Sequence, residues 1–232
     1  MSRRLKIWSI VAIGVLGLVI GGPWVYIHLI HGEAPPPLAL GSTSASPSAT
    51  GGTTGADPTA GDGSWTVTDD SVVGYRVEEV LFGQNADAVG RTSAITGTMT
   101  LDGATVTDAS FIVDMTTVTS DESRRDDQFN GRIMETSVYP TATFSLSESI
   151  DLGTLPDANT DVTATATGDL TLHGVTKTVT FDIQGRDTGS QVEIAGSIPI
   201  TFADWGISNP SFGPVTTEDN GILEFSIVFV PA

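Results

Sequence analysis

From residue 64 onward, apolar and polar positions alternate with a period of two. In residues 95–101 the apolar row is Ile95, Gly97, Met99 and Leu101, and threonine fills the positions between. Strict alternation is typical of a β-sheet with one buried face. With two opening strands in residues 64–68 and 72–77, the pattern predicts eight or nine strands joined by turns such as LDGA and RDTGS. The other alternating segments are residues 109–115, 142–146, 162–172, 179–183, 192–200 and 223–229.

A sheet of this size with one apolar face either packs on a second sheet or closes on itself. Short side chains on the apolar rows favour closure around a space, because an eight-stranded barrel with small inward residues can hold one small ligand. A tightly filled barrel with small residues at bends is the alternative. The small residues in question are Gly97, Ala109, Ala142, Ala164, Ala166, Gly168 and Gly196.

One segment, residues 117–140, interrupts the alternation. Thr119 and Glu122 have the spacing of a capping box at the start of a helix. Gly131 predicts that the helix ends close by. We therefore expect a short helix over one end of the barrel, with its apolar side lining the mouth of any cavity.

Two segments precede the predicted barrel. Residues 7–27 carry no charge and are long enough to form a helix that spans about 30 Å of hydrocarbon. The basic sequence SRRLK precedes them. We expect an uncleaved single-pass anchor in residues 1–30, with a cytoplasmic N-terminus; a cleaved signal peptide is the alternative. Residues 31–63 are rich in Pro, Gly, Ser, Thr and Ala and predict a disordered linker. The barrel domain, residues 64–232, is then expected outside the cytoplasmic membrane.

Composition narrows the chemistry further. The chain has no cysteine, which excludes disulfides and thiolate catalysis. Its 28 acidic residues outnumber 10 basic ones, and a net charge of −18 repels nucleic-acid phosphates. An imperfect calcium loop begins at Asp126, but its twelfth position is Ser137 where a glutamate is needed. The sequence predicts no metal, no cofactor and no nucleic-acid partner.

Three segments in order resemble the YceI-like family: RRDDQFNGRIMETSVYPTATF, GDLTLHGVTKTVTF and ADWGIS. The opening SWTVTDDSVVGYRV fits the same family, so that the resemblance covers residues 64–232. It implies an extended antiparallel eight-stranded barrel of lipocalin-like shape that holds an isoprenoid or similar amphiphilic lipid. Arg125 and Asp126 match a recurring pair that is expected to fix the helix to the barrel. The chain departs from the family pattern in residues 78–92 and 125–140, around the expected pocket entrance.

Two residues of the GDLTLHGVTKTVTF segment are candidates for chemistry. His173 lies at the end of a predicted hairpin on the outward parity, without a cysteine or second histidine nearby to act with. We expect it to hydrogen-bond there and not to catalyse. Lys177 shares the parity of Val179 and Phe181, so it either contacts a polar lipid head at the opening or lies on the rim with its alkyl stem packed.

Together these observations predict a non-enzymatic, membrane-tethered protein that carries or stores an isoprenoid-like lipid. An envelope or stress-related structural protein, with a filled barrel and protein partners, is the alternative. The residues expected to line the pocket are Tyr75, Met99, Phe111, Val113, Phe129, Ile133, Phe144, Ala164, Ala166, Leu170, Lys177, Val179, Phe181, Ile194, Ile198 and Phe225.

Overall fold

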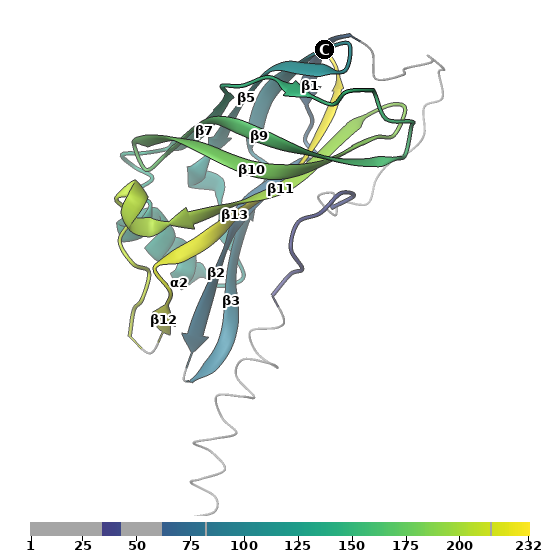
Figure 1. Cartoon of the computed structure of the whole chain (residues 1–232). Coiled ribbons are helices and arrows are strands. Elements are labelled where there is room, and N and C mark those ends of the chain that lie inside the picture. Colours follow the sequence, from purple (N-terminus) through teal and green to yellow (C-terminus); the bar gives the residue numbers. More distant parts are fainter. Residues whose placement is uncertain (1–33, 43–61, 82, 214) are drawn as a thin grey trace, which may run out of the picture.

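The structure, a computed structural model, describes residues 34–42, 62–81, 83–213 and 215–232. Nearly all of its regular structure is β-strand, as the alternating pattern predicts (Figure 1). The strands are β1 (Gly63–Val67), β2 (Val72–Leu81), β3 (Gln84–Thr92), β4 (Ile95–Asp102), β5 (Thr105–Asp114), β6 (Thr119–Ser120), β7 (Thr141–Leu146), β8 (Ile150–Asp151), β9 (Asp161–Leu172), β10 (Val175–Asp187), β11 (Val192–Thr201), β12 (Val215–Thr217) and β13 (Asn220–Pro231). The helical segments are η2 (Met115–Thr117), α2 (Ser123–Gln128), η3 (Phe129–Ile133) and η4 (Phe202–Trp205).

Eight of the described strands close into an antiparallel ring. Their order is β1, β4, β5, β7, β9, β10, β11 and β13, and β13 pairs back with β1. Burial alternates along them: in β4, Ile95, Met99 and Leu101 are buried, while the intervening side chains are more exposed. Closure leaves no free edge in the ring. The prediction of an eight-stranded antiparallel barrel is confirmed.

The ring is splayed at one end. One end of β13 pairs with β1, but its first half pairs with β2, which continues into β3 and away from the ring. The short strand β6 pairs with β3 there, and α2 follows it. Figure 1 shows α2, β12 and the β2–β3 hairpin gathered at this end. We call it the mouth end; the opposite end, with the β10–β11 turn and the C-terminus, is the closed end.

The predicted start of the helix is wrong. Thr119 is not the cap, because Thr119 and Ser120 pair with β3 as a strand. The cap is Glu122, whose carboxylate accepts a hydrogen bond from the N–H of Arg124. The helix α2 continues into a π-helical turn, η3, which ends at Ile133, so the prediction that the helix ends near Gly131 is confirmed.

The glycines of the apolar rows do not leave empty space. A Cβ at Gly97 would lie 2.5 Å from a ring carbon of Phe111, and one at Gly168 would lie 2.3 Å from a ring carbon of Phe144. Gly196 is filled in the same way by an aromatic ring of β13. The expectation that these glycines supply free volume is therefore wrong: each accommodates a phenylalanine ring from a neighbouring strand.

The predicted anchor and most of the predicted linker lie outside the described residues. Within the described part, no helix has both the length and the apolar character needed to cross a membrane. The exception within the linker is residues 34–42, which lie against the outer face of β2, β3 and β13 through three hydrogen bonds. This part of the linker is docked, although its composition predicts disorder.

Candidate functional site

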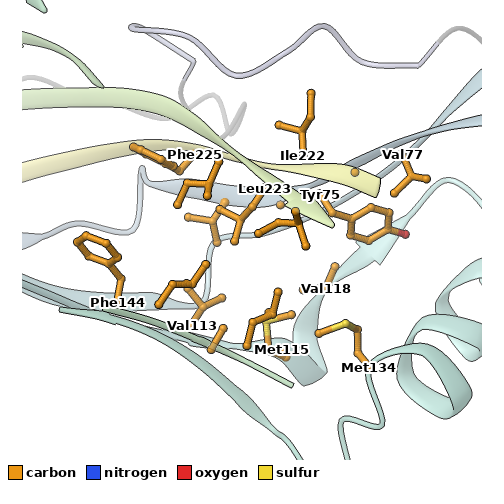
Figure 2. A pocket seen from close by; sticks show the side chains of 18 of the residues that line it. Tyr75, Val77, Val113, Met115, Val118, Met134, Phe144, Ile222, Leu223 and Phe225 are labelled. Carbon is orange, nitrogen blue, oxygen red and sulfur yellow. The ribbon is translucent and has the colours of Figure 1, made fainter. Parts of the chain in front are cut away.

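The barrel interior contains a cavity of about 650 Å³ that opens at the mouth end. Its walls are almost wholly apolar and come from β2 and from every strand of the ring except β1; Figure 2 shows part of them. The volume lies within the range of small-molecule and cofactor sites, roughly 300–1,000 Å³. The interior is thus hollow and does not match the filled-barrel alternative.

A row of phenylalanines forms one continuous part of the wall. Phe144 contacts Phe181 edge-on at 5.6 Å between ring centres, and Phe181 contacts Phe225 at 5.9 Å. Phe111 extends the row to Phe144 and to Phe229, at 6.2 and 5.9 Å. Contacts of this geometry add to the stability gained by burying the rings. The row is therefore a fixed apolar surface against which a flexible apolar chain can pack.

Charged side chains border the cavity only near its mouth. They come from the end of β2 and from the α2 segment: Glu79, Glu122, Arg124, Arg125 and Asp127. Arg125 Nη2 lies 3.2 Å from Glu79 Oε1, and Arg125 also pairs with Asp121. Burial alone lowers the pKa of the Arg125 guanidinium, but the charges of Glu79 and Asp121 outweigh it and raise that pKa, so the guanidinium stays positively charged.

This ion pair joins α2 to the barrel wall. Glu79 is 8% exposed and projects from β2, while Arg125 belongs to the helix. The next residue, Asp126, accepts hydrogen bonds from the N–H and hydroxyl of Ser120 at 2.8 and 2.7 Å. The prediction that Arg125 and Asp126 fix the helix to the barrel is confirmed.

Tyr75 supplies an uncharged polar group at the same place. Its ring stacks on Phe129 of η3 at 5.1 Å and lies against Gly90 of β3, where a Cβ would come within 2.4 Å of it. Burial raises the pKa of the Tyr75 phenol far above its ordinary value, so it remains protonated. Figure 2 shows its hydroxyl near the helical segment and away from the phenylalanine row. The mouth therefore offers a neutral hydrogen-bonding group beside the ion pair.

Arg132 of η3 ties together two sides of the mouth. It donates hydrogen bonds to the carbonyls of Pro210 at 2.8 Å and Asn209 at 3.3 Å, and its guanidinium lies 5.7 Å from the ring centre of Phe212. It is held from its own helix by Gln128, whose side-chain oxygen accepts from Nε at 2.6 Å. Both segments border the cavity, so this arginine holds two parts of its lining together.

The structure brings most of the predicted lining residues to the cavity. Ala164, Lys177 and Val179 do not border it: Ala164 lines a small depression at the closed end, and Val179 packs against the core from outside the cavity. Those that border the cavity are Tyr75, Met99, Phe111, Val113, Phe129, Ile133, Phe144, Ala166, Leu170, Phe181, Ile194, Ile198 and Phe225. Their contact with a ligand remains a prediction.

Lys177 is not among the residues that border the cavity. Its ammonium lies 3.1 Å from Asp204 and 6.0 Å from the ring centre of Trp205, both in η4. These contacts agree with the interpretation as a rim lysine, and the suggested contact with a polar lipid head stays a prediction. The sequence-based reasoning also missed Glu79 and Arg132, because the period-two pattern gives no information about partners across a mouth.

His173 occupies the hairpin turn between β9 and β10, with a positive φ of 49°. Its Nε2 lies 3.1 Å from a Glu135 carboxylate oxygen and its Nδ1 lies 3.3 Å from the Trp205 carbonyl, while Tyr139 contacts the ring edge-on at 4.6 Å. Both nitrogens thus face acceptors, and the predicted hydrogen-bonding role is confirmed. Among the described residues, no cluster of His, Asp and Glu could hold a metal ion.

Residues 65–229 match the YceI-like domain family. The chain belongs to this family. Its curated relatives include a UPF0312 protein of Vibrio parahaemolyticus, 31% identical over 127 residues, and one of Pseudomonas savastanoi, 30% identical over 129 residues. These matches cover 51% and 52% of this YceI-like chain, and 64% and 62% of the two relatives. The matched part is thus less than two thirds of each relative's length.

Solved structures share the YceI-like barrel. A polyisoprenoid-binding domain from Saccharophagus degradans, implicated in plant cell wall breakdown, superposes with a TM-score of 0.59 at 15% identity. The match covers 72% of this chain and 98% of that domain. Burkholderia cenocepacia BcnA superposes with a TM-score of 0.51 at 21% identity, over 66% of this chain and 95% of BcnA. At these identities the likeness establishes the fold.

Proposed function

We propose that this YceI-like protein binds a polyisoprenoid or a similar long-chain amphiphile inside its barrel, for carriage or storage at the outer side of the cytoplasmic membrane. The observation that carries the proposal is the distribution of polarity in the cavity. Its interior is apolar, and its charged and hydrogen-bonding groups are confined to the mouth. An amphiphile with an apolar chain and one polar end has the same distribution.

The energetics favour a long apolar chain. Burial of apolar surface contributes about 0.8 kcal/mol for each CH₂ group, so affinity grows with the length of chain that enters. The phenylalanine row and the aliphatic residues opposite it offer no interior polar partner, which makes the inside unsuitable for a polar solute. The solved Saccharophagus degradans domain, with the same fold, is a polyisoprenoid-binding domain, and this supports the choice of chain.

Binding without catalysis agrees with the side chains at hand. His173 is engaged by Glu135 and by the Trp205 carbonyl, at a turn outside the cavity lining. The ion pair of Glu79 and Arg125 joins two structural elements. We assign these groups to holding the mouth together and to no chemical step.

The membrane part of the proposal is supported by the sequence. Residues 7–27 form an uncharged stretch of spanning length behind a basic N-terminus, and an acidic barrel domain follows. An anchor of this kind would keep a lipid-binding barrel beside the bilayer that supplies its ligand.

The test is the purification of the full chain from bacterial membranes, followed by native mass spectrometry and by extraction and identification of bound lipid. We expect a stoichiometric prenyl lipid, and reloading of the delipidated protein by an added polyprenol. A clean protein mass, with no uptake of polyprenol, would refute the proposal and favour a structural role.

A further inference from the structure

Three charged side chains form a buried cluster on the outside of the barrel. Arg76 of β2, Arg91 of β3 and Glu224 of β13 belong to the rows that face away from the cavity, since Tyr75, Val77 and Leu223 line it. Arg91 Nη2 lies 2.8 Å from Glu224 Oε1, and Arg76 Nε lies 3.4 Å from Oε2. Glu224 is nevertheless only 3% exposed and Arg76 only 9%. Charged residues on an outer face are rarely so covered, and their burial needs a cause.

Residues 34–42 contact this cluster from outside. The Pro35 carbonyl accepts a hydrogen bond from Arg76 Nη2 at 2.7 Å, and the Pro36 carbonyl accepts one from Arg91 Nη2. The Leu38 N–H lies 3.4 Å from Glu224 Oε2 and donates to it. The segment thus gives both arginines acceptors and gives the glutamate a donor.

The sequence APPPLALGS suits this arrangement. Proline fixes φ, so a run of three loses little entropy when it is ordered. Proline also lacks an N–H, and the carbonyls of such a run point outward for external donors. Two arginine guanidinium groups are donors of that kind. Leu38 and Leu40 are half-buried while the three prolines are exposed, so the segment has a side turned to the barrel.

The direction of the segment is set by its contacts. Arg76 forms ion pairs with Glu224 and with Asp87. Asp87 is paired in the sheet with Glu78, which is nearer the mouth than Arg76 is. Pro35 contacts Arg76, whereas Leu38 contacts Glu224, which pairs with Gly74 on the far side of Arg76 from the mouth. The segment therefore runs from the mouth end towards the middle of the barrel, beside β2 and β3 (Figure 1). Ala34, the first residue of the segment, is thus at the end of the segment that is nearer the mouth.

We propose that residues 34–42 are a docking strap, with Arg76, Arg91 and Glu224 as its binding site, and that the docked strap holds the cavity mouth towards the membrane. This rests on the proposed function, since it takes the anchor in residues 1–30 as given. With the strap docked, only residues 28–33 separate the apolar stretch from the barrel. Six residues reach at most about 20 Å when fully extended.

The geometry has a consequence for lipid transfer. A free linker of residues 31–63 would have a typical span of roughly 30 Å and would allow the barrel to adopt any orientation relative to the membrane. The strap shortens the tether and fixes its attachment on the outer face of β2, on the mouth side of Glu224. A lipid can then pass between the bilayer and the cavity without crossing open water.

The test measures orientation on the full chain in lipid vesicles. The protein has no cysteine, so a single one can carry a fluorophore. Ser208 is exposed beside the mouth and Ser190 is exposed in the turn at the closed end. We make Ser208→Cys and Ser190→Cys, and compare quenching by a headgroup-labelled phospholipid. We expect several-fold stronger quenching at position 208.

Strap replacement then assigns the cause. One variant exchanges residues 34–42 for nine Gly and Ser residues, and a matched control exchanges residues 43–51 in the same way. We expect the difference between positions 208 and 190 to vanish in the strap variant and to persist in the control. Equal quenching in the unchanged chain, or a difference that survives strap replacement, overturns the proposal.

Lipid content and carbonate resistance of the same preparations separate the two proposals. A chain that washes off the vesicles overturns the anchor and the orientation together. A chain that stays inserted and loaded with lipid but shows no orientation overturns the strap alone.

Discussion

Filling the cavity separates a hollow barrel from a packed one. Ala166 on β9 borders the cavity opposite Phe181 of β10. Gly168 lies two residues further on the same face, but a Cβ there would meet the Phe144 ring at 2.3 Å and the Ser145 carbonyl at 2.5 Å. A large addition at the first position should therefore be tolerated, and a small addition at the second should not.

The two substitutions should affect different properties: the larger one should lower lipid affinity, and the smaller one should lower stability. A phenyl ring has a volume of about 100 Å³, roughly three water molecules at 30 Å³ each. Ala166→Phe places it in a cavity of about 650 Å³, so the delipidated protein should keep its stability. Its affinity for polyprenol should fall about tenfold or more, which is 1.4 kcal/mol or more. Gly168→Ala adds one carbon, yet overpacking of this kind costs about 1–3 kcal/mol.

The assay is thermal melting of the delipidated variants together with a polyprenol titration. For a domain of this size 1 kcal/mol corresponds to about 2–4 °C, so Gly168→Ala should lower Tm by about 2–12 °C. Ala166→Phe should change Tm by less than that and lose binding. If Ala166→Phe lowers Tm as much as Gly168→Ala does, the interior is already full, and the lipid-binding argument fails.

Four further outcomes are expected. His173→Ala should cost about 1 kcal/mol from the lost hydrogen bonding to Glu135 and to the Trp205 carbonyl, and should leave polyprenol affinity unchanged; lost affinity at unchanged Tm would contradict its structural role. Arg132→Ala should speed lipid release several-fold in stopped-flow exchange, whereas Arg186→Ala, which removes an exposed ion pair at the closed end, should not; equal rates would show that the Arg132 contacts do not gate the mouth. The full chain should remain in the membrane fraction through carbonate washing with an N-terminus near residue 1, and a mature form starting between residues 34 and 45 would disprove the anchor. Delipidation should lower Tm, because a lipid present at a hundred times its Kd adds about 2.7 kcal/mol to the free energy of unfolding. An unchanged Tm would mean that no bound ligand had been removed.

The strands could be predicted because burial of one face dictates them residue by residue. Ile95, Met99 and Leu101 occupy the inner face of β4 as the period-two pattern requires. The pattern also predicts most of the cavity wall, since inward parity and contact with the interior coincide for short strands. It fails for Ala164, Lys177 and Val179, because alternation says which way a side chain points and not how far the cavity extends.

The mouth could not be predicted in the same way. Glu79 and Arg125 are far apart in sequence, and nothing in either local segment specifies the other. Thr119 and Glu122 have the spacing of a capping box, but pairing of Thr119 with β3 overrides that local preference. Residues 34–42 have the composition of a linker, and only the arginines on the outer wall explain why they are ordered. In each case a partner distant in sequence decides the outcome.

The size of the cavity bears on whether it is ever empty. In packed cores, unfilled volume costs on the order of 24 cal/mol for each Å³, so an unfilled closed void of 650 Å³ would cost roughly 15 kcal/mol. That is as large as the whole stability of a typical domain, about 5–15 kcal/mol. The figure is an upper bound here because the mouth opens the space to solvent, but water gains few hydrogen bonds from an apolar wall. The closed ring of strands and the phenylalanine rings held against glycines keep the walls from collapsing inward. An apolar occupant would offset the free-energy cost of this unfilled volume, and this best explains why the barrel is hollow.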